Sequence, residues 1–210
     1  MTIEFLDVYD GNRNRIGTAC RDVVHALGLW HNTVHCWVVW DGKMVFQRRS
    51  RNTGDKNAGK LYTTASGHVS AGETLEVAFA REVMQEVGLT IANPNPMGVI
   101  VWVSDIRKKD GTIMVDRAYS NMFWAEHKGA IEDFRFDDGE VDGVVAIDLA
   151  EFLNWCSAEE GALEGVEWDG VKLSRVTLTA DDFARGDYEI AYSKYQPFAR
   201  AMERGLKKGI

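Results

Sequence analysis

Two glutamates one helical turn apart, Glu82 and Glu86, are the residues of this sequence best suited to metal chemistry. They lie in a segment without Pro or Gly between Thr74 and Gly88, a pattern typical of a helix with a hydroxyl N-cap and a left-handed terminal glycine. At about 100° per residue, the two carboxylates project within roughly 40° of each other, with Gln85 beside them. Carboxylate and carboxamide oxygens suit Mg²⁺ or Mn²⁺. The spacing therefore predicts a divalent-cation site on this helix.

The apolar positions of the same segment indicate which side of the helix should be buried. They fall on a broadly opposite arc, and an amphipathic helix buries its apolar arc. The two carboxylates are therefore expected on the exposed side. An ordinary solvated acidic face is the alternative, because like charges one turn apart destabilise a helix only slightly. The apolar positions are Val77, Ala80, Val83, Met84 and Val87.

The stretch from Gly67 to Leu89 resembles the Nudix box, Gly-x5-Glu-x7-Arg-Glu-aliphatic-x-Glu-Glu-x-Gly-aliphatic. The resemblance implies an α/β (α+β) fold, a Nudix-type α/β/α sandwich with a mixed central sheet, the box as loop-helix-loop, and a C-terminal helix. It also implies hydrolysis of a diphosphate linked to another group, with Mg²⁺ or Mn²⁺ as cofactor. The residues in register are Gly67, Glu73, Arg81, Glu82, Val83, Glu86, Gly88 and Leu89.

The resemblance assigns chemical roles to the acidic face of the helix. Glu86 matches a metal ligand, and Glu82 matches a residue that serves as ligand or general base. The carbonyl of Gly67 matches a frequent backbone ligand. Gln85 stands where the family has a metal-binding Glu, and its carboxamide oxygen can coordinate but carries no charge. A weaker metal affinity or a missing second metal is therefore expected.

Three other positions of the box have structural roles in the family that the chain resembles. Glu73 and Arg81 match a pair that braces the loop against the helix. Gly88 matches the glycine after the helix, where a left-handed residue is needed.

Three candidates lie outside the box. Arg48 and Arg49 end a predicted strand, and arginine forks bind phosphate oxygens bidentately. They are therefore candidates for a phosphate clamp, with a solvated rim as the alternative. Glu140 precedes a predicted strand at 143–147. In Nudix proteins a glutamate before the final strand often completes the metal shell or acts as base, and a plain surface loop is the alternative.

The elements that must position these residues are predicted from local patterns. An Asp-Gly pair at 41–42 between apolar runs indicates a hairpin. The run 98–103 is continuously apolar and predicts a buried strand, and residues 108–111 predict a hairpin tip. The apolar residues of the stretch 21–35 show no clear helical or strand period. Further strands are expected at 3–9, with Ile3, Phe5 and Val8 inward, and at 16–19, 34–40, 43–47, 61–66, 114–126 and 143–147, with helices at 149–156 and 188–206.

Length and composition bound the function. The 210 residues are expected to form one domain, with N-terminal strands in 1–30, a core in 31–156, and an insertion and C-terminal helix in 157–210. Strand character is possible near 171–173 and 176–178. The net charge of −8 argues against a nucleic-acid polymer as partner. No apolar run is long enough to span a membrane. Three scattered cysteines suggest reduced thiols and a cytoplasmic protein, and a homodimer is possible.

The region before the box is similar to bacterial Nudix proteins grouped with isopentenyl-diphosphate isomerase. That resemblance raises an isomerase as an alternative to a hydrolase of a small nucleoside-diphosphate-type or related molecule. The isomerase uses a Cys before the Gly-His of the box loop, where this chain has Ser66. It also uses a Glu on a later strand, where this chain offers Asp116 or Ala118. Because Ser is a poor acid toward carbon, isomerase chemistry is disfavoured. An inert Nudix binding module is a third reading.

His31, His35 and His68 are similar in placement to histidines that bind a metal in that isomerase. Imidazole is the commonest metal ligand, so a second metal site is conceivable. Purely structural roles for these histidines are the simpler interpretation.

Overall fold

The computed structural model describes residues 3–52, 57–107, 111–137, 139–158, 161–184 and 191–208. Its helices are α1 (Arg21–Leu27), α2 (Leu75–Val87), α3 (Leu149–Ala158) and α4 (Ala191–Lys208), with short 3-10 turns η1 (Ile131–Asp133) and η2 (Ala180–Asp182). Its strands are β1 (Phe5–Tyr9), β2 (Arg15–Cys20), β3 (Trp30–Trp40), β4 (Lys43–Arg49), β5 (Leu61–Tyr62), β6 (Ala65–His68), β7 (Asn95–Arg107), β8 (Ile113–His127), β9 (Val141–Asp148), β10 (Leu163–Trp168) and β11 (Leu173–Leu178).

These strands form one sheet of eleven strands, with the main order β11-β10-β9-β4-β3-β1-β2. Strand β8 pairs with both β3 and β7, while β5 pairs with β4 and β6 with β3. The pairing of β3 with β8 is parallel and the other pairings are antiparallel. The predicted mixed sheet is therefore confirmed.

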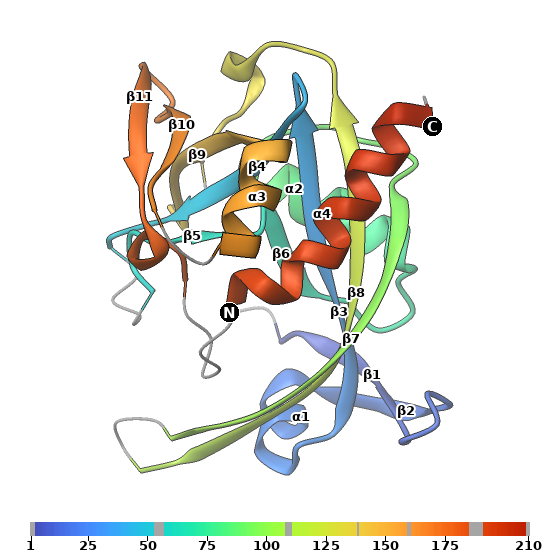
Figure 1. Ribbon diagram of the computed structural model, residues 1–210. Coiled ribbons are helices and arrows are strands. Elements are labelled where there is room, and N and C mark those ends of the chain that lie inside the picture. The colour runs from blue at the N-terminus through green and yellow to red at the C-terminus, as the bar shows by residue number, and fades with distance from the viewer. Residues whose placement is uncertain are drawn as a thin grey trace.

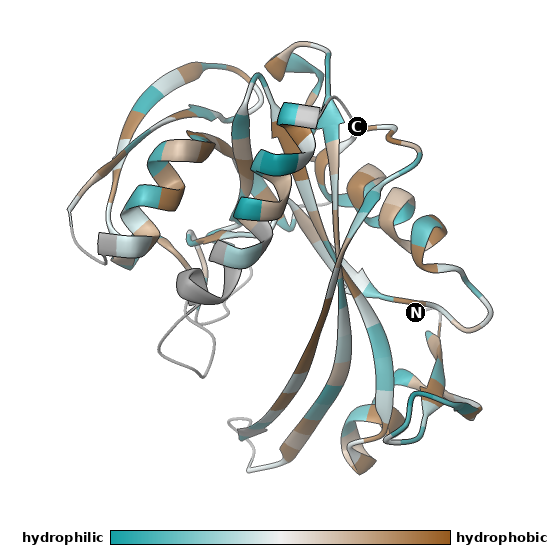
Figure 2. Ribbon diagram, turned by 45° about the vertical axis from the view of Figure 1, so that its right-hand side comes forward, coloured by the Kyte–Doolittle hydropathy of each residue, from teal (hydrophilic) through white to brown (hydrophobic). Residues whose placement is uncertain are grey.

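Helices cover the two faces of this sheet. Figure 1 shows α3 and α4 in front of the strands and α2 behind them. The turned view in Figure 2 shows the strands passing between α2 on one side and α3 and α4 on the other. The expected α/β/α sandwich is confirmed. Among the described residues, no helix combines the length and apolar character needed to cross a membrane.

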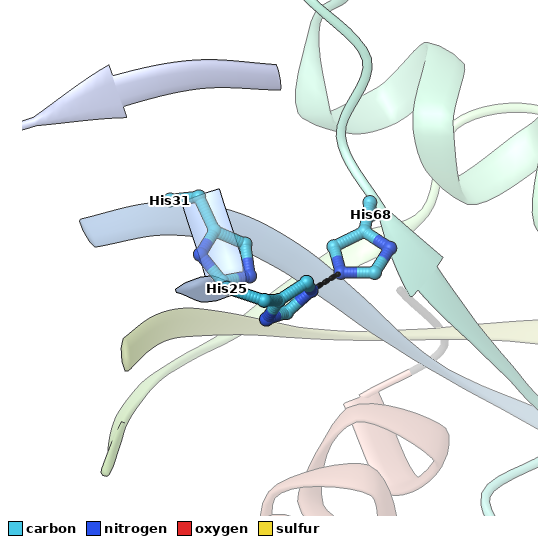
Figure 3. Close-up of side chains that lie close together, drawn as sticks. All are labelled: His25, His31 and His68. Atoms are coloured by element: carbon cyan, nitrogen blue, oxygen red, sulfur yellow. Dashed lines mark hydrogen bonds between the residues drawn. The ribbon is translucent and has the colours of Figure 1, made fainter. Parts of the chain in front are cut away.

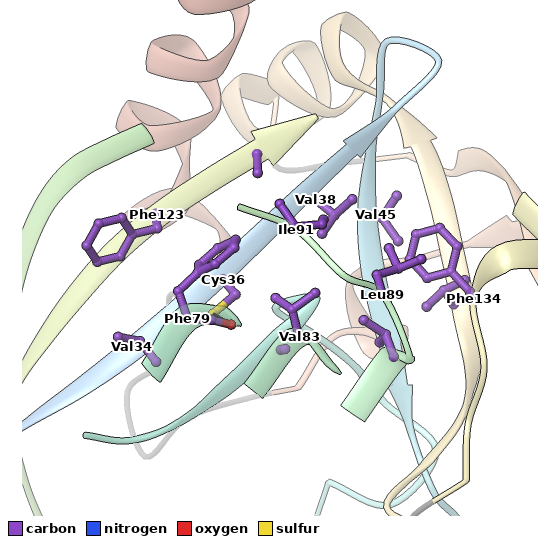
Figure 4. Packing of buried hydrophobic residues seen from close by; sticks show 14 of the residues in the cluster. Val34, Cys36, Val38, Val45, Phe79, Val83, Leu89, Ile91, Phe123 and Phe134 are labelled. Atoms are coloured by element: carbon purple, nitrogen blue, oxygen red, sulfur yellow. Dashed lines mark hydrogen bonds between the residues drawn. The ribbon is translucent and has the colours of Figure 1, made fainter. Parts of the chain in front are cut away.

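Strand β3 shows how alternation divides the core. Val34, Cys36 and Val38 belong to the cluster that packs against α2, drawn in Figure 4. Trp37 and Val39 belong to the cluster on the opposite face, which includes residues of α3 and α4. Because successive side chains of a strand point to opposite faces, one apolar strand serves both layers.

The hairpin predicted at Asp41 and Gly42 is confirmed. Both residues have positive φ, at 48° and 70°, as a two-residue hairpin turn requires. Strands β3 and β4 pair directly on either side of the turn, with Trp40 opposite Lys43. This hairpin places β4 beside β3 in the middle of the sheet.

Some burial predictions are wrong. In β7, Val99, Val101 and Val103 are 38%, 60% and 43% exposed. The paired β7 and β8 extend past α3 and α4 (Figure 1), so these two helices do not cover this end of β7. At the start of the chain, Ile3 and Phe5 are exposed and Val8 is buried. The predicted inward placement is therefore wrong for Phe5, which begins β1 on its exposed face, and for Ile3, which precedes the strand.

Other elements were missed or lie outside the description. Helix α1 occupies part of 21–35, where no period was found. The predicted strand character in 157–178 is more extensive than expected, because β10 and β11 pair with each other and extend the main sheet through β9. The predicted hairpin tip at 108–111 and the first turn of the predicted helix at 188–206 fall largely on residues outside the described ranges.

Candidate active site

Helix α2 begins and ends as its sequence predicts. The hydroxyl of Thr74 accepts a hydrogen bond from the backbone N–H of Val77 at 3.3 Å. Gly88 is left-handed, with φ of 69°, and its N–H donates to the carbonyl of Met84 at 3.1 Å. Both caps therefore fix the length of the helix that carries the two glutamates.

The buried face of α2 differs from the prediction. Val77 and Met84 are 55% and 44% exposed, whereas Glu82 and Glu86 are each only 8% exposed. The predicted exposed placement of the carboxylates is therefore wrong. The reason is long-range packing, because β6 and the end of β4 lie over this arc of the helix and cover the carboxylates.

Glu86 is held by two strands. Its Oε2 accepts a hydrogen bond from Nε2 of Gln47 on β4 at 2.5 Å. Its Oε1 accepts from the backbone N–H of Ser66 on β6 at 3.4 Å. Burial, reinforced by the negative charge of Glu82, raises the pKa of Glu86 to about 8, although both hydrogen bonds oppose that shift. The two hydrogen bonds therefore compensate only part of the cost of burying a negative charge on Glu86.

Glu82 lies against the glycine that opens the box. A Cβ added to Gly67 would lie 2.0 Å from Oε1 of Glu82, which is an impossible contact. Only glycine lets the backbone approach the carboxylate this closely. Burial raises the pKa of Glu82, while the neighbouring Arg81 opposes the shift. Gly67, Glu82 and Glu86 are therefore brought together, as the sequence predicts.

Arg81 braces the loop against the helix. Its Nε and Nη2 donate to the two carboxylate oxygens of Glu73, both at 2.9 Å. Nη2 also donates to the carbonyl of His68 at 2.8 Å, and Nη1 donates to Glu82 at 2.6 Å. Burial alone would raise the pKa of Glu73, but the hydrogen bonds from Arg81 and from the N–H of Ser70 leave it lowered. The guanidinium therefore links the box loop to the acidic face of α2.

Gln85 lies beside this arrangement on the exposed side of α2. Its Oε1 accepts a hydrogen bond from Nη1 of Arg81 at 3.1 Å. The side chain is thus within one turn of the buried carboxylates, but it is engaged by the bracing arginine.

The two arginines at the end of β4 have different surroundings. Arg48 is buried and forms an ion pair with Glu167 of β10, and its Nη1 donates to the carbonyl of Gly59 at 3.0 Å. Arg49 is half-buried. A register shift between Arg48 and Arg49 in the pairing of β4 with β9 interrupts strand alternation at this point. The structure therefore places Arg48 against Glu167 and Arg49 at the end of β4, two residues after the Gln47 that donates to Glu86.

Glu140 lies just before β9, as predicted, and is exposed. Its backbone carbonyl accepts a hydrogen bond from the N–H of Ser50 at 2.8 Å, which ties this loop to the end of β4. The negative charge of Glu140 contributes to the raised pKa of Glu86. The two carboxylates are therefore within electrostatic reach of each other.

Sequence reasoning missed Gln47 as a site residue. It is separated from Glu86 by 39 positions and carries no motif. The available signal was the uncharged polar residue that follows the apolar run Met44–Phe46 in β4. A buried amide at such a place needs a hydrogen-bond partner, and Glu86 supplies it.

Of the three histidines singled out from the sequence, two lie together in the structure and one lies apart. His35 is half-buried beside Tyr62, with ring centroids 6.0 Å apart, and desolvation lowers its pKa to about 4. His31 and His68 do lie together, and the third ring beside them is His25 of α1 (Figure 3). His35 lies apart from these rings because four residues of β3, about 13 Å at about 3.3 Å per residue, separate it from His31.

Comparison with known proteins identifies the family of this chain. Residues 29–172 match the family model described as the NUDIX domain. An uncharacterised Nudix hydrolase of Clostridium acetobutylicum is 32% identical over 201 residues, which cover 90% of this chain and 93% of that protein. An uncharacterised Nudix hydrolase of Rhodococcus erythropolis is 31% identical over 180 residues, covering 83% of this chain and 90% of the relative.

Solved structures share the fold. A protein of Deinococcus radiodurans superposes with a TM-score of 0.52 at 19% identity, covering 75% of this chain and 91% of that protein. At this level of identity the likeness concerns the fold alone.

Proposed function

The chain belongs to the Nudix family, and from that premise we propose that it hydrolyses a diphosphate linkage in a nucleoside-diphosphate-type or related small molecule, with Mg²⁺ or Mn²⁺. The observation that carries the proposal is the pair of buried carboxylates on consecutive turns of α2, with the pKa of Glu86 raised to about 8. Two such groups repel each other unless a proton or a cation lies between them.

The donor set fits a hard divalent cation. Glu82 and Glu86 offer carboxylate oxygens, the backbone of Gly67 runs beside them, and Gln85 offers a carboxamide oxygen. Mg²⁺ is commonly held by one or two protein carboxylates, with substrate phosphates and water completing its shell. When bound, the ion supplies charge stabilisation for the phosphate oxygens and a lower pKa for the attacking water.

The remaining steps belong to side chains of the chain. Gln47 and the N–H of Ser66 orient the carboxylate of Glu86, so that its free lone pairs face away from β4 and β6. Glu82 acts as ligand or general base. Glu140 is the other candidate for the base. It is exposed in the loop just before β9 and within electrostatic reach of Glu86, and a base must remain accessible to water.

Arg49 is the better placed of the two proposed phosphate ligands. It is half-buried at the end of β4, two residues after the Gln47 that donates to Glu86, whereas Arg48 would have to leave Glu167 to bind a phosphate. An arginine at this point would hold the far phosphate while the scissile bond lies over the carboxylates.

A panel of diphosphate compounds, incubated with and without Mg²⁺ and followed by product identification, tests the proposal. Mg²⁺-dependent release of phosphate or of a nucleoside monophosphate is the expected result. Interconversion of prenyl diphosphate isomers would support the isomerase instead, and binding without turnover would support an inert module. Ser66 in place of a Cys argues against the isomerase, because its hydroxyl is a poor acid toward carbon.

A further inference from the structure

Strands β3 and β4 part from each other close to the carboxylates of α2. They pair with each other at three positions next to their hairpin turn, and the last of these joins Val38 to Val45. Beyond this point β4 pairs with β5 and β3 pairs with β6. The chain crosses from β5 to β6 at Thr63 and Thr64, which are both fully buried. The sheet therefore divides into two branches at this crossing, β4 with β5 and β3 with β6.

The hydroxyl of Thr64 joins the two branches at the point where they separate. Its Oγ1 accepts a hydrogen bond from the backbone N–H of Val38 on β3 at 2.9 Å, and it donates to the backbone carbonyl of Val45 on β4. Both partners are backbone groups of the kind that adjacent strands bond to each other. A hydroxyl can serve both strands because it has one donor and two acceptor sites. A connection between β3 and β4 thus runs through a side chain of a third segment.

Glu86 is held by one donor from each branch. Its Oε2 accepts a hydrogen bond from Gln47, which lies two residues beyond Val45 on β4. Its Oε1 accepts from the backbone N–H of Ser66, which lies two residues beyond Thr64 on β6. The position of the carboxylate therefore depends on the distance between the two branches.

The crossing lies close enough to these donors to control that distance. Two residues of a strand span about 7 Å, so both donors are near the hydroxyl that joins the branches. Thr64 is fully buried, Gln47 is 2% exposed and Glu86 is 8% exposed. A close-packed interior has few voids in which a displaced strand could be accommodated. A change in the spacing of the strands at Thr64 is therefore expected to move Gln47 relative to Ser66.

From this geometry we propose that Thr64 is a positioning residue of the active site, and that its hydroxyl sets the separation of the two strands that hold Glu86. Thr64 acts through the backbones of β4 and β6 and not by contact with the cation or the substrate. The inference rests on the proposed function where it concerns metal affinity, because Glu86 is the proposed ligand. The effect on the hydrogen bonds of Glu86 can be measured without metal or substrate.

Thr64→Val tests the proposal, because it keeps the branched shape of the side chain and removes the hydroxyl. The NMR signals of the Gln47 side-chain amide and of the Ser66 backbone N–H, recorded in chelator, report whether both donors still reach Glu86. We expect both signals to shift in this variant. A subsequent Mg²⁺ titration should give a Kd about ten- to a hundredfold higher than in the parent, as for other groups that orient metal ligands. Thr64→Ser retains a hydroxyl and should restore the signals and the Kd of the parent.

Thr33→Val is the matched control. It removes another hydroxyl bond between strands, since Oγ1 of Thr33 on β3 donates to Oγ of Ser120 on β8 at 3.0 Å. This bond lies outside the crossing, so the variant should keep the Gln47 and Ser66 signals and the Mg²⁺ affinity of the parent. Should Thr64→Val fail to fold by circular dichroism, Thr64→Cys carries the same test, because a thiol is a weak donor and a weak acceptor.

The outcomes separate this proposal from the proposed function. Unchanged Gln47 and Ser66 signals in folded Thr64→Val would overturn the positioning role. Equal changes in Thr64→Val and Thr64→Ser would also overturn it, because packing and not the hydroxyl would then set the separation of the strands. Signals that depend on the hydroxyl in a parent that takes up no Mg²⁺ would support the role of Thr64 and contradict the proposed metal-dependent hydrolysis.

Discussion

Gln47 donates a hydrogen bond from its Nε2 to Oε2 of Glu86 at 2.5 Å. The donor is on β4, in the middle of the sheet, and the acceptor is on α2. The bond therefore spans the interface between sheet and helix at which the proposed catalytic site lies. Because Glu86 is buried, this bond also stabilises its ionised form. The orientation and the charge of the proposed metal ligand thus depend on one amide side chain outside the box.

Replacing that amide should weaken metal binding. Gln47→Leu leaves a buried carboxylate with one donor fewer, so we expect the Mg²⁺ concentration for half-maximal activity to rise about ten- to a hundredfold, as for other partners that orient metal ligands. A metal titration of activity measures the change. Asn154→Leu, at an exposed position on α3, is the control and should match the parent. An unchanged midpoint for Gln47→Leu would mean that the amide does not orient the ligand.

Gln85→Glu should have the opposite effect. The substitution restores the charged residue that the box normally has at this position, next to Arg81 and one turn or less from both carboxylates. The Mg²⁺ midpoint should fall, because a third carboxylate strengthens attraction for the cation. The same titration checks it, and an identical midpoint in the two proteins would sink the idea that Gln85 limits metal affinity.

Gly67→Ala should separate the box loop from α2. The added Cβ would lie 2.0 Å from Oε1 of Glu82, so either the loop or the carboxylate must move. A displacement of about 1 Å in a catalytic group costs roughly a hundredfold in rate, and we expect a loss of that size in kcat. Gly11→Ala is the matched control, since its Cβ would meet no heavy atom within 4 Å. Full activity of a folded Gly67→Ala protein would contradict this reading of the contact.

Glu86 should make the metal-free protein less stable as pH rises. Its pKa is raised from 4.5 to about 8 in the folded state, so between these values the folded state binds more protons than the unfolded state. The free energy of unfolding should then fall with pH across this window, by about 1.4 kcal/mol per pH unit at most. Urea unfolding in chelator at several pH values measures the slope.

Glu86→Gln should remove this contribution to the slope, and saturating Mg²⁺ should reduce it in the parent because the cation replaces the proton. A slope between pH 5 and 8 that is the same in Glu86→Gln and parent would show that Glu86 titrates as an ordinary surface carboxyl.

Local signals in the sequence predicted the parts of the site that are local in the chain. Thr74 and Gly88 cap α2 as expected, and Asp41 with Gly42 forms the hairpin, because caps and tight turns depend on neighbours only a few residues away. The box spacing placed Glu82 and Glu86 one turn apart for the same reason.

Burial and contacts between distant elements depend on long-range packing, which the sequence patterns did not predict. The exposure of Val77 and the burial of Glu82 depend on which strands lie over α2. The ion pair between Arg48 and Glu167 joins residues 119 positions apart. The histidine cluster required the placement of α1, whose short segment has no readable period. Period and spacing describe one element at a time, so contacts between elements had to come from the structure.

The central claim is that buried carboxylates on α2 hold the cation that hydrolysis requires. The most direct test is the Mg²⁺-dependent kcat of Glu86→Gln on the best compound from the diphosphate panel, beside the parent protein and with folding checked by circular dichroism. We predict a loss of about a hundredfold or more, since even the partners of metal ligands account for ten- to a hundredfold. A folded Glu86→Gln protein with the kcat and Mg²⁺ dependence of the parent would contradict the account.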